Sequence, residues 1–498
     1  MATAAQLRLP LGSQRISGVS VPRVRASIYE AGAQTRRTLG WRAPTTSPNR
    51  ELLSTLTTIR DRSRQSVRTG GWAKGIVDKL VFNMVGTGVV PLSKATDPQF
   101  RRDIQALWLQ WTDESATSGQ QEFYGQQSQA VRCWLEAGEV FIRLRKRLDS
   151  DGLTVPLQLE VIEPEMCPHT FDSQRDSNRI RAGIEFSPIG KRVAYYFYAS
   201  RPGDIQDFDP SDIRRVDAST VIHLYEELRP GQIRGVPHLT PALIILRELD
   251  KFLDATLLRS QIANLFAGFV SRPSTDTGDA NVLSGLAADA TSAEGRPIVS
   301  LEPGIMQELG PGEKIEFNDP PSADPFGPAF MSTLLRNVAS AVSVPYEVLT
   351  GDMSGLNDRS MRVVLQEFRR GIQARQYQIV AHLLCRAVWK AWIDQVFMNS
   401  LLPIPAAYAS DPRPWAAVEW RPQGWAYTHP VQDVKATQDA IKAGLTTRSA
   451  AVSDQGYDAE AIDAEQADDN RRAEGLGLHY ESGTGATAAA PAPPPAGA

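Results

Sequence analysis

The sequence predicts an α+β protein with several domains, and three observations support this prediction. The chain has 498 residues, which is too long for a single hydrophobic core and is enough for about two to four domains. Segments 237–269 and 361–402 carry apolar residues at the spacing of amphipathic helices. Between residues 140 and 223, shorter segments alternate apolar and polar residues, as half-buried strands do.

The first part of the chain is predicted to be an extended arm, residues 1–54, followed by helices. Up to about residue 54 the sequence lacks sustained periodicity. Helices are expected at 51–82, with a break near Gly70 and Gly71, at 98–112 and at 127–136. The apolar positions of the second of these helices are Phe100, Ile104, Leu107, Leu109 and Trp111. Strands follow at 140–144, 157–162, 181–186, 193–198 and 221–223.

Two further helices flank a segment that is rich in glycine, proline and aspartate. The first, 237–269, is expected to begin with Thr240 as its cap and Pro241 in its first turn. The second, 325–343, has Phe330, Leu334, Val338 and Val342 on one stripe. The segment between them, 270–324, is predicted to be a small protruding subdomain with short strands near 298–301 and 315–317.

The second helix ends at a loop, 344–360, that is punctuated by proline, glycine and asparagine. A long helix, 361–402, follows it without a proline. Segment 403–430 is dense in proline and tryptophan and indicates a boundary before helical hairpins that extend to residue 482. The Gly-, Ala- and Pro-rich tail, 483–498, is expected to be disordered.

Composition excludes some classes of protein. The chain is 42% hydrophobic and 22% charged, and it has no apolar run long enough to cross a membrane. The formal net charge is −4, but the charges are unevenly distributed along the chain. Residues 1–80 hold fourteen basic and four acidic residues, whereas residues 450–482 hold two basic and nine acidic ones. The basic arm suggests contact with a polyanion or an acidic protein, although charged, solvated termini are equally expected. The three cysteines are far apart and predict isolated thiols.

The motifs of catalysis are missing from the sequence. There is no phosphate-binding G-x-x-x-x-G-K-[ST] loop, because Gly70, Gly71, Lys74 and Gly75 have the wrong spacing. There is no G-x-S-x-G motif either. The six histidines are scattered and predict satisfied or surface positions. An autonomous packaging ATPase and a histidine-based metal or triad site are therefore disfavoured.

Two clusters have alternative interpretations. Glu160, Glu163 and Glu165 could hold Mg²⁺ in a nuclease site, but a solvated strand end is favoured because Glu160 and Glu163 do not share a strand face. Tryptophans could stack on bases. Trp108, Trp111, Trp389 and Trp392 are instead expected to pack on buried helix faces, because they are spaced i, i+3.

A set of segments, taken in order, resembles one family. Residues 344–352, VPYEVLTGD, are followed by Asn357 and Arg359 and then by a long helix. Upstream lie the Arg-rich helix and Val-Gly-x-Gly turn of 59–91, WLQW at 108–111, EAGEVFIRLR, LQLEVIEPE, RPGQIRGVP and LEPGIMQELGPGEKIEF. This ordered set, over about residues 29–402, is similar to the lambda-type phage portal proteins. RPGQIRGVP is its most distinctive string, and the residues after Asn357 depart from the usual pattern.

The resemblance implies a portal fold that forms a ring. Its parts would be a wing of α/β structure, two stem helices, a small α/β clip, a tunnel loop, a long bent helix and a helical crown. The matching residues are 55–236 for the wing, 237–269 and 325–343 for the stem, 270–324 for the clip, 344–360 for the tunnel loop, 361–402 for the long wing helix and 403–482 for the crown.

The function that the resemblance implies is that of a portal protein, a dodecameric ring at one capsid vertex through which DNA is packaged and ejected. The expected partners are further copies of the chain, the terminase large subunit, the major capsid and scaffold proteins, head-completion proteins and double-stranded DNA that passes without sequence preference. No membrane, cofactor, metal or catalytic residue is expected. The protein would lie at the portal vertex of the virion, after assembly in the host cytoplasm.

The candidate site residues belong to three regions. In the tunnel loop they are Asp352, Met353, Ser354, Leu356, Asn357, Asp358 and Arg359. In the stem, the expected channel lining is Glu248, Lys251, Asp254 and Arg259. At the junction between wing and stem they are Arg229, Gln232 and Arg234. A stem of mixed charge suits a sliding polyanion, because each phosphate that a lysine or arginine neutralises strengthens binding.

Two other classes of function stay open. One is a DNA-processing hydrolase with convergent carboxylates, and the other is a monomeric DNA-binding adaptor that uses the basic arm. The mass of the protein in solution discriminates these from a ring.

Overall fold

The computed structural model has two compact units, Met1–Ser47 and Pro48–Ala498. The residues that it describes are 36, 39–40, 45–204, 208–265, 269–271, 290–291, 297–298, 314–316, 327–403 and 411–478. Most of the predicted arm and clip, and the whole predicted tail, therefore lie outside the described residues. The account below concerns the second unit.

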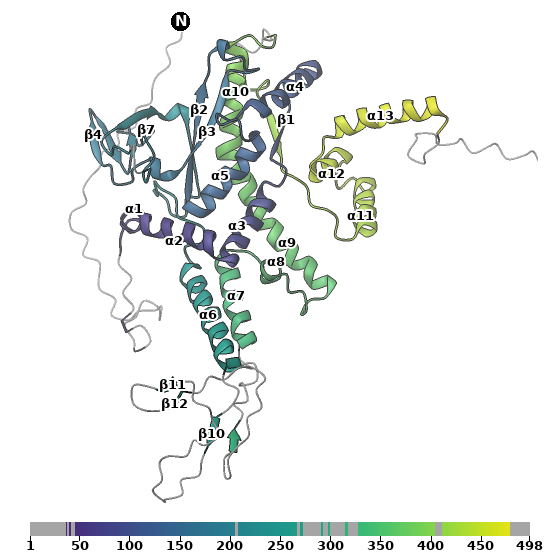
Figure 1. Cartoon of the computed structure of the whole chain (residues 1–498). Helices are drawn as coiled ribbons and strands as arrows, with labels where there is room; N and C mark the ends of the chain where they lie inside the picture. Colours follow the sequence, from purple (N-terminus) through teal and green to yellow (C-terminus); the bar gives the residue numbers. More distant parts are fainter. Residues whose placement is uncertain are drawn as a thin grey trace, which may run out of the picture. The chain divides into compact units, whose positions relative to one another are not determined.

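The unit begins with five helices (Figure 1). They are α1 (Pro48–Leu53), α2 (Leu56–Thr69), α3 (Gly71–Met84), α4 (Pro98–Glu114) and α5 (Phe123–Ala137). The predicted break is confirmed, because Gly70 has an extended backbone between α2 and α3. Asp97 caps α4 by accepting hydrogen bonds from the backbone N–H groups of Gln99 and Phe100. Helix α1 lies inside the predicted arm, and Leu109 of α4 is exposed instead of buried.

Two antiparallel sheets follow α5. The first has the order β3-β2-β9, with β2 (Glu139–Lys146) between β3 (Leu157–Ile162) and β9 (Val221–Tyr225). The second is a meander of five strands, β4 (Ser173–Arg175), β5 (Asn178–Arg181), β6 (Ile184–Phe186), β7 (Arg192–Tyr198) and β8 (Ile213–Asp217). The predicted single strand 181–186 is wrong, because Ala182 and Gly183 have positive φ angles and turn the chain between β5 and β6.

The sheets pack against each other through an aromatic cluster. The ring of Phe141 on β2 lies edge-on to the rings of Tyr195 and Phe197 on β7, with centroids 5.6 and 5.2 Å apart. Ile184 and Val216 complete this buried cluster from the second sheet. The apolar faces of both sheets are therefore used inside one chain.

A long helical segment crosses the main core (Figure 1). It consists of α9 (Asp358–Arg375), a π-helical segment (Gln376–Cys385) and α10 (Arg386–Met398). The predicted packing of the tryptophans is confirmed: Trp389 and Trp392 lie 5.1 and 5.0 Å from Trp108, and all are buried. Helix α9 begins at Asp358, so the last residues of the predicted loop are helical.

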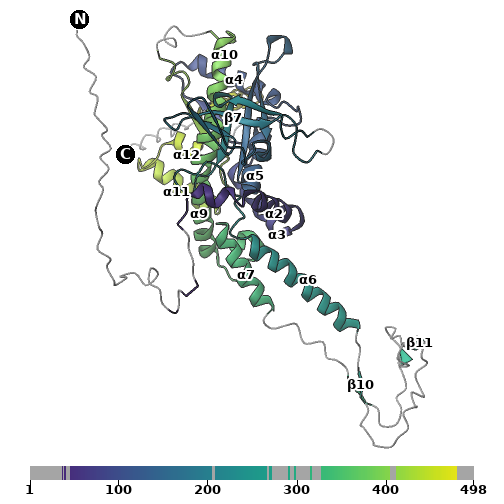
Figure 2. The same ribbon diagram turned by 90° about the vertical axis from the view of Figure 1, so that its left-hand side faces the viewer.

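Helices α6 (Leu243–Leu265) and α7 (Gly327–Ala341) lie side by side in both views (Figures 1 and 2). The predicted start of the first is wrong, since Thr240 lies in a turn and its hydroxyl donates to the carbonyl of Pro237. Of the segment between them, the described residues form two short antiparallel pairs. These are β10 (Phe269–Ser271) with β13 (Lys314–Glu316), and β11 (Ala290–Thr291) with β12 (Pro297–Ile298). After α7 comes the short helix α8 (Tyr346–Thr350).

The C-terminal region contains a strand and three helices. Strand β14 (Val418–Arg421) pairs with β1 (Val90–Ser93), and Trp420 is buried in the main core. The described residues of segment 403–430 are therefore more than a boundary, because β14 belongs to the main body. The predicted helical hairpins are confirmed as α11 (Pro430–Lys442), α12 (Arg448–Asp454) and α13 (Ala459–Leu476).

Candidate functional site: the buried junction, the stem and the loop

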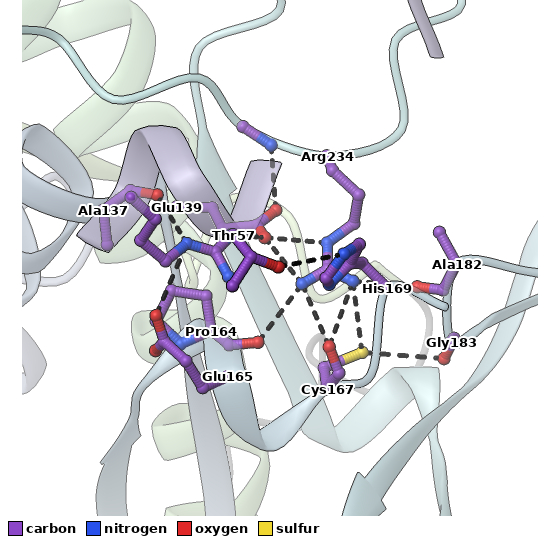
Figure 3. Close-up of polar contacts among 12 residues, drawn as sticks. Thr57, Ala137, Glu139, Pro164, Glu165, Cys167, His169, Ala182, Gly183 and Arg234 are labelled. Atoms are coloured by element: carbon purple, nitrogen blue, oxygen red, sulfur yellow. Dashed lines mark hydrogen bonds and ion pairs between the residues drawn. The ribbon is translucent and has the colours of Figure 1, made fainter. Parts of the chain in front are cut away.

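A buried ionic cluster lies where α2, the start of β2 and the segment before α6 meet (Figure 3). Its centre is Glu139, which is fully buried. One carboxylate oxygen, Oε1, accepts from Arg60 Nη2 at 2.9 Å and from Arg234 Nε at 2.7 Å. The other, Oε2, lies 2.9 Å from His223 Nε2 and from the backbone nitrogen of Gly235. Four groups thus converge on one carboxylate, which we call the Glu139 cluster.

Charge neutralisation explains how this carboxylate can be buried. Burial alone raises the pKa of Glu139, but Arg234, His223 and Arg60 together hold the pKa well below its ordinary value. Burial also lowers the pKa of His223 to about 4. His223 is therefore neutral near pH 7 and donates through Nε2, while no described residue pairs with its Nδ1.

Arg234 joins the cluster to the loops of the wing region. Its Nη1 donates to the carbonyl oxygens of Cys167 at 3.1 Å and Ala182 at 2.9 Å, and its Nη2 donates to that of Pro164 at 3.2 Å. A guanidinium with several donors in one plane suits such a set of acceptors. Arg234, which belongs to the RPGQIRGVP string, thus holds both the loop after β3 and the turn between β5 and β6 (Figure 3).

The other predicted junction residues have different roles. Gln232 is buried, accepts from the backbone nitrogen of Leu228 at 3.2 Å and donates to the carbonyl of Arg234 at 2.7 Å. Arg229 is exposed and forms an ion pair with Glu51 of α1 at 2.8 Å. Gln232 therefore shapes the turn, and Arg229 links its surface to α1.

The chain then passes very close to the end of α5. A Cβ atom placed on Gly235 would lie 1.9 Å from the carbonyl oxygen of Gly138, and Gly138 itself has a φ of +91°. Three residues later, the backbone N–H of His238 donates to the carbonyl oxygen of Leu135, and His238 Nε2 lies 3.0 Å from the carbonyl oxygen of Val342. Through His238, the segment before α6 therefore contacts both α5 and the residue that follows α7.

Beyond this point, α6 changes character along its length. Leu246 and Leu249 are buried against the body, whereas Leu253, Leu257 and Leu258 are 41%, 59% and 56% exposed. Its contact with α7 includes the rings of Phe252 and Phe330, whose centroids lie 5.4 Å apart. Among the described residues, these three leucines of α6 have little to pack against.

The predicted stem lining lies on this exposed part. Lys251 donates to Glu248 at 2.7 Å, one turn apart on the helix surface. Asp254 and Arg259 are exposed. Because neighbouring charges have opposite signs, this helix surface has no strong field of either sign. Such a surface suits DNA that must slide past without adhering.

The loop after α7 is anchored at its base and exposed at its tip. Lys79 of α3 donates to the carbonyl of Leu349 at 3.1 Å, which holds α8 against the body. Gly351, with a φ of +76°, ends α8. Asp352 Oδ1 accepts from the backbone nitrogen and the hydroxyl of Ser354 at 3.1 and 2.6 Å, and Met353 is exposed. Leu356 is half-buried and so is not part of the tip.

The end of the loop is occupied by a helix cap and by contacts with the C-terminal region. Asn357 Oδ1 accepts from the backbone nitrogen of Ser360 at 2.8 Å and caps α9. Asp358 pairs with His429 at 2.9 Å and with Arg362 at 3.4 Å, while Arg359 is exposed. Asp358, predicted to repel phosphate from the loop, therefore joins α9 to the segment before α11, as does Arg369, whose guanidinium lies 5.4 Å from the centroid of the Trp425 ring.

The carboxylates of the alternative nuclease site are each paired with arginine. Glu160 contacts Arg145, and Glu163 contacts Arg201. Glu165 lies 3.0 Å from Arg64. The described residues contain no group of three or more His, Cys, Asp or Glu residues that could hold a metal ion. In the described part of the chain, no helix is sufficiently long and apolar to span a bilayer.

Comparisons with known proteins decide between the interpretations. A sequence model of the phage portal proteins of the lambda family matches residues 34–376. The chain belongs to the lambda family of phage portal proteins. The function implied by the resemblance, that of a phage portal protein, is thereby confirmed.

Individual relatives agree with the family. The probable portal protein of Halomonas phage phiHAP-1 is 26% identical over 84% of this chain and 81% of its own length. Portal protein B of Escherichia phage lambda is 21% identical over 88% of each chain. Among solved structures, a chain in the neck of an empty GTA particle is 13% identical, with a TM-score of 0.43 over 83% of this chain and 95% of that one.

The sequence missed the other members of the Glu139 cluster. Glu139 directly precedes the strand predicted at 140–144, His223 ends the strand predicted at 221–223, and Arg60 lies in the helix predicted at 51–82. The available signal was the position of Glu139, an acidic residue directly before a run of apolar strand residues. An acid in such a place needs a buried cation, but the sequence alone offers many arginines.

Proposed function

We propose that the chain assembles into a closed ring, a dodecamer by analogy with its family, at one vertex of the capsid. The channel of the ring would admit DNA during packaging and release it during ejection. The observation that carries the proposal is the exposure of Leu253, Leu257 and Leu258 on α6, which the described part of the chain does not cover.

The proposed channel wall consists of α6 and α7, and the tunnel loop narrows the channel. The exposed residues Asp352 and Met353 would face the passing duplex, and the mixed charges around Lys251 would limit adhesion. The loop acts mechanically in this proposal, because its polar side chains are used in turns and caps and none forms a nucleophile–base pair. We propose no catalytic activity for the chain.

The partners follow from the same assignment. The segment between α6 and α7, the proposed clip, would dock the terminase large subunit and later the head-completion proteins. The wing and crown would contact the capsid and scaffold proteins. The ring would assemble in the host cytoplasm and remain at the portal vertex of the virion.

The test is ring formation by a stem variant. Replacement of Leu257 by Asp should leave the fold of the single chain intact, because the side chain is 59% exposed. It should abolish rings in negative-stain images and shift the mass in solution to that of a monomer. The matched control is Thr256→Asp, at an exposed polar position one residue away whose hydroxyl bonds only to its own helix. A monomeric wild-type chain at every salt concentration would contradict the proposal and favour the DNA-binding adaptor.

The role of the loop has its own test. Deletion of residues 353–356 should preserve rings and reduce the amount of DNA retained in filled heads, because the deletion removes the exposed tip and leaves the Asn357 cap of α9. Heads of that variant with as much stable DNA as the wild type would show that the loop is only a connector.

A further inference from the structure

A groove of about 720 Å³ lies between the two sheets, beside α2 and α5. Its floor is apolar and includes Val161, Ile162, Phe197 and Val216. Arginines line much of the rest: Arg64, Arg132, Arg143, Arg145, Arg201, Arg214 and Arg215, the last of which is paired with Glu185 at 2.7 Å. The groove is remote in sequence from the stem and from the loop.

All but one of these arginines already have a carboxylate. Arg145 is bound to Glu160, Arg201 to Glu163 and Arg64 to Glu165. Arg132 lies 3.4 Å from Glu136, and Arg214 lies 3.4 Å from Asp212. Arg143 is different, because no described residue forms a hydrogen bond or an ion pair with its guanidinium.

The register of β2 and β3 explains why Arg143 is left over. Glu160 lies directly opposite Arg143, but it is bound by Arg145, one step along the strand. Arg147 likewise binds Gln158 diagonally, with Nε 2.9 Å from Oε1. Along the same diagonal, the partner of Arg143 would be Ile162, whose side chain has no hydrogen-bond acceptor. The ladder of polar pairs therefore ends with one unpaired guanidinium.

The surroundings of Arg143 favour an incoming anion. Partial burial and the neighbouring charge of Arg145 lower the pKa of Arg143. A guanidinium remains charged even so, and Glu160 offsets its charge only in part, because Glu160 is bound to Arg145. A carboxylate placed beside Arg143 would supply the ion-pair partner that the register of β2 and β3 does not provide.

The groove also presents unpaired backbone groups along two strand edges. The backbone of Leu159 points away from β2, because its N–H donates to Ser115 and its carbonyl accepts from Thr117. Val161, two residues later, points the same way, and among the described residues nothing pairs with its N–H or carbonyl. On β8, the edge strand of the second sheet, the same alternation leaves the backbone of Arg215 free, since Tyr196 opposite it bonds toward β6.

We propose that this groove binds an extended acidic peptide segment of another protein. A carboxylate of the peptide would pair with Arg143, neighbouring apolar side chains would lie on Val161 and Phe197, and the peptide backbone would add to a strand edge. Duplex DNA fits less well, because it offers no backbone amide groups and because Glu136, Glu160 and Glu163 also line the groove.

A labelled peptide tests the proposal. The probe is a fluorescein-labelled hexapeptide of alternating glutamate and valine, titrated with the full-length protein and followed by fluorescence anisotropy. The comparison probe has glutamine in place of every glutamate. The acidic probe should bind more tightly than the neutral one, and raised salt should weaken its binding.

Arg143→Gln should weaken binding of the acidic probe by about tenfold or more, because one charged hydrogen-bonding partner is lost. The matched control is Arg147→Gln, one residue beyond the end of β2 and outside the groove; it should change binding less than about twofold. Both variants should form the same assemblies as the wild type, which shows that they are folded.

Two results would overturn the proposal. One is equal affinity of the wild type and Arg143→Gln for the acidic probe. The other is a twenty-base-pair duplex whose binding depends on Arg143 while the peptide shows none, which would assign the groove to nucleic acid. The portal function would stand in either case, since the test does not involve the stem.

Discussion

Glu139 and Glu248 are both glutamates that contact basic side chains, but their surroundings are opposite. Glu139 is fully buried and receives four donors from α2, β9 and the segment before α6. Glu248 is exposed on α6 and contacts one lysine in the next turn of the same helix. The junction is thus completed within one chain, and the second half of α6 is left open to a neighbour.

The same contrast holds for leucines on a single helix. Leu249 is fully buried, and Leu257, about two turns farther along, is 59% exposed. Folding of the chain therefore depends on the junction, whereas assembly depends on the open surface of the stem. Substitutions at the two places should differ in their effects accordingly.

The largest effect is expected at the centre of the junction. Replacement of Glu139 by Gln removes the ion-pair partner of the buried Arg234 and the nearer of the two carboxylates beside Arg60, which keeps Glu165 at 3.5 Å. It should lower the free energy of unfolding by about 3–5 kcal/mol. The measurement is urea denaturation followed by tryptophan fluorescence. The control, Glu248→Gln, should change the free energy by less than about 1 kcal/mol, because its ion pair is exposed. Equal effects of the two substitutions would contradict the contrast.

The two leucines give the next effect. Leu249→Ala creates a cavity and should lower the free energy of unfolding by about 2–5 kcal/mol. Leu257→Ala should lower that of the single chain by less than about 0.5 kcal/mol, while it weakens ring assembly. Denaturation of the single chain and the mass of the assembly distinguish these outcomes. If Leu257→Ala destabilised the single chain as strongly, α6 would have a second partner within it.

Acid should weaken the junction specifically. The folded pKa of His223 is about 4, below the ordinary value of 6.5, so the unfolded chain binds the extra proton first as the pH falls. The contribution of His223 to the free energy of unfolding is complete above about pH 6.5. It decreases as the pH falls from 6.5 to 4, and about 3 kcal/mol of it is lost at pH 4. The lowered pKa of Glu139 acts in the same direction at still lower pH.

The measurement for this prediction is the free energy of unfolding between pH 7 and pH 4. The variant His223→Gln has no imidazole to protonate, so its curve should be flatter than that of the wild type. Parallel curves would show that other groups cause the acid sensitivity.

The smallest of these effects concerns the close approach of two backbones. Gly235→Ala places a Cβ atom 1.9 Å from the carbonyl oxygen of Gly138 and should cost about 1–3 kcal/mol through the shift that it forces. Its control is Gly475→Ala in α13, where the added atom meets nothing within 4 Å and helix propensity should rise by up to about 1 kcal/mol. Opposite signs in thermal denaturation are expected, and a neutral Gly235→Ala would mean that the crossing is loose.

Much of the secondary structure could be predicted because it depends on local patterns. The break at Gly70, the strands β2 and β3 and the tryptophan faces of α4 and α10 follow from periodicity and from residue type. The prediction failed where a local pattern was ambiguous. An apolar run across Ala182 and Gly183 looked like one strand, and the positive φ angles that divide it are set by packing, including a bond from Arg234 to the carbonyl of Ala182.

The sequence by itself determined the α+β class, the order of the elements and the family, because apolar spacing and ordered motifs are properties of the linear chain. Only the tertiary structure decided which charged residues are buried. Arg60 and Arg234 meet Glu139 from distant parts of the sequence, and Arg143 is left unpaired by the register of two strands. The physical reason is that the state of a charge depends on every group within a few ångströms, and those groups come together only when the chain folds.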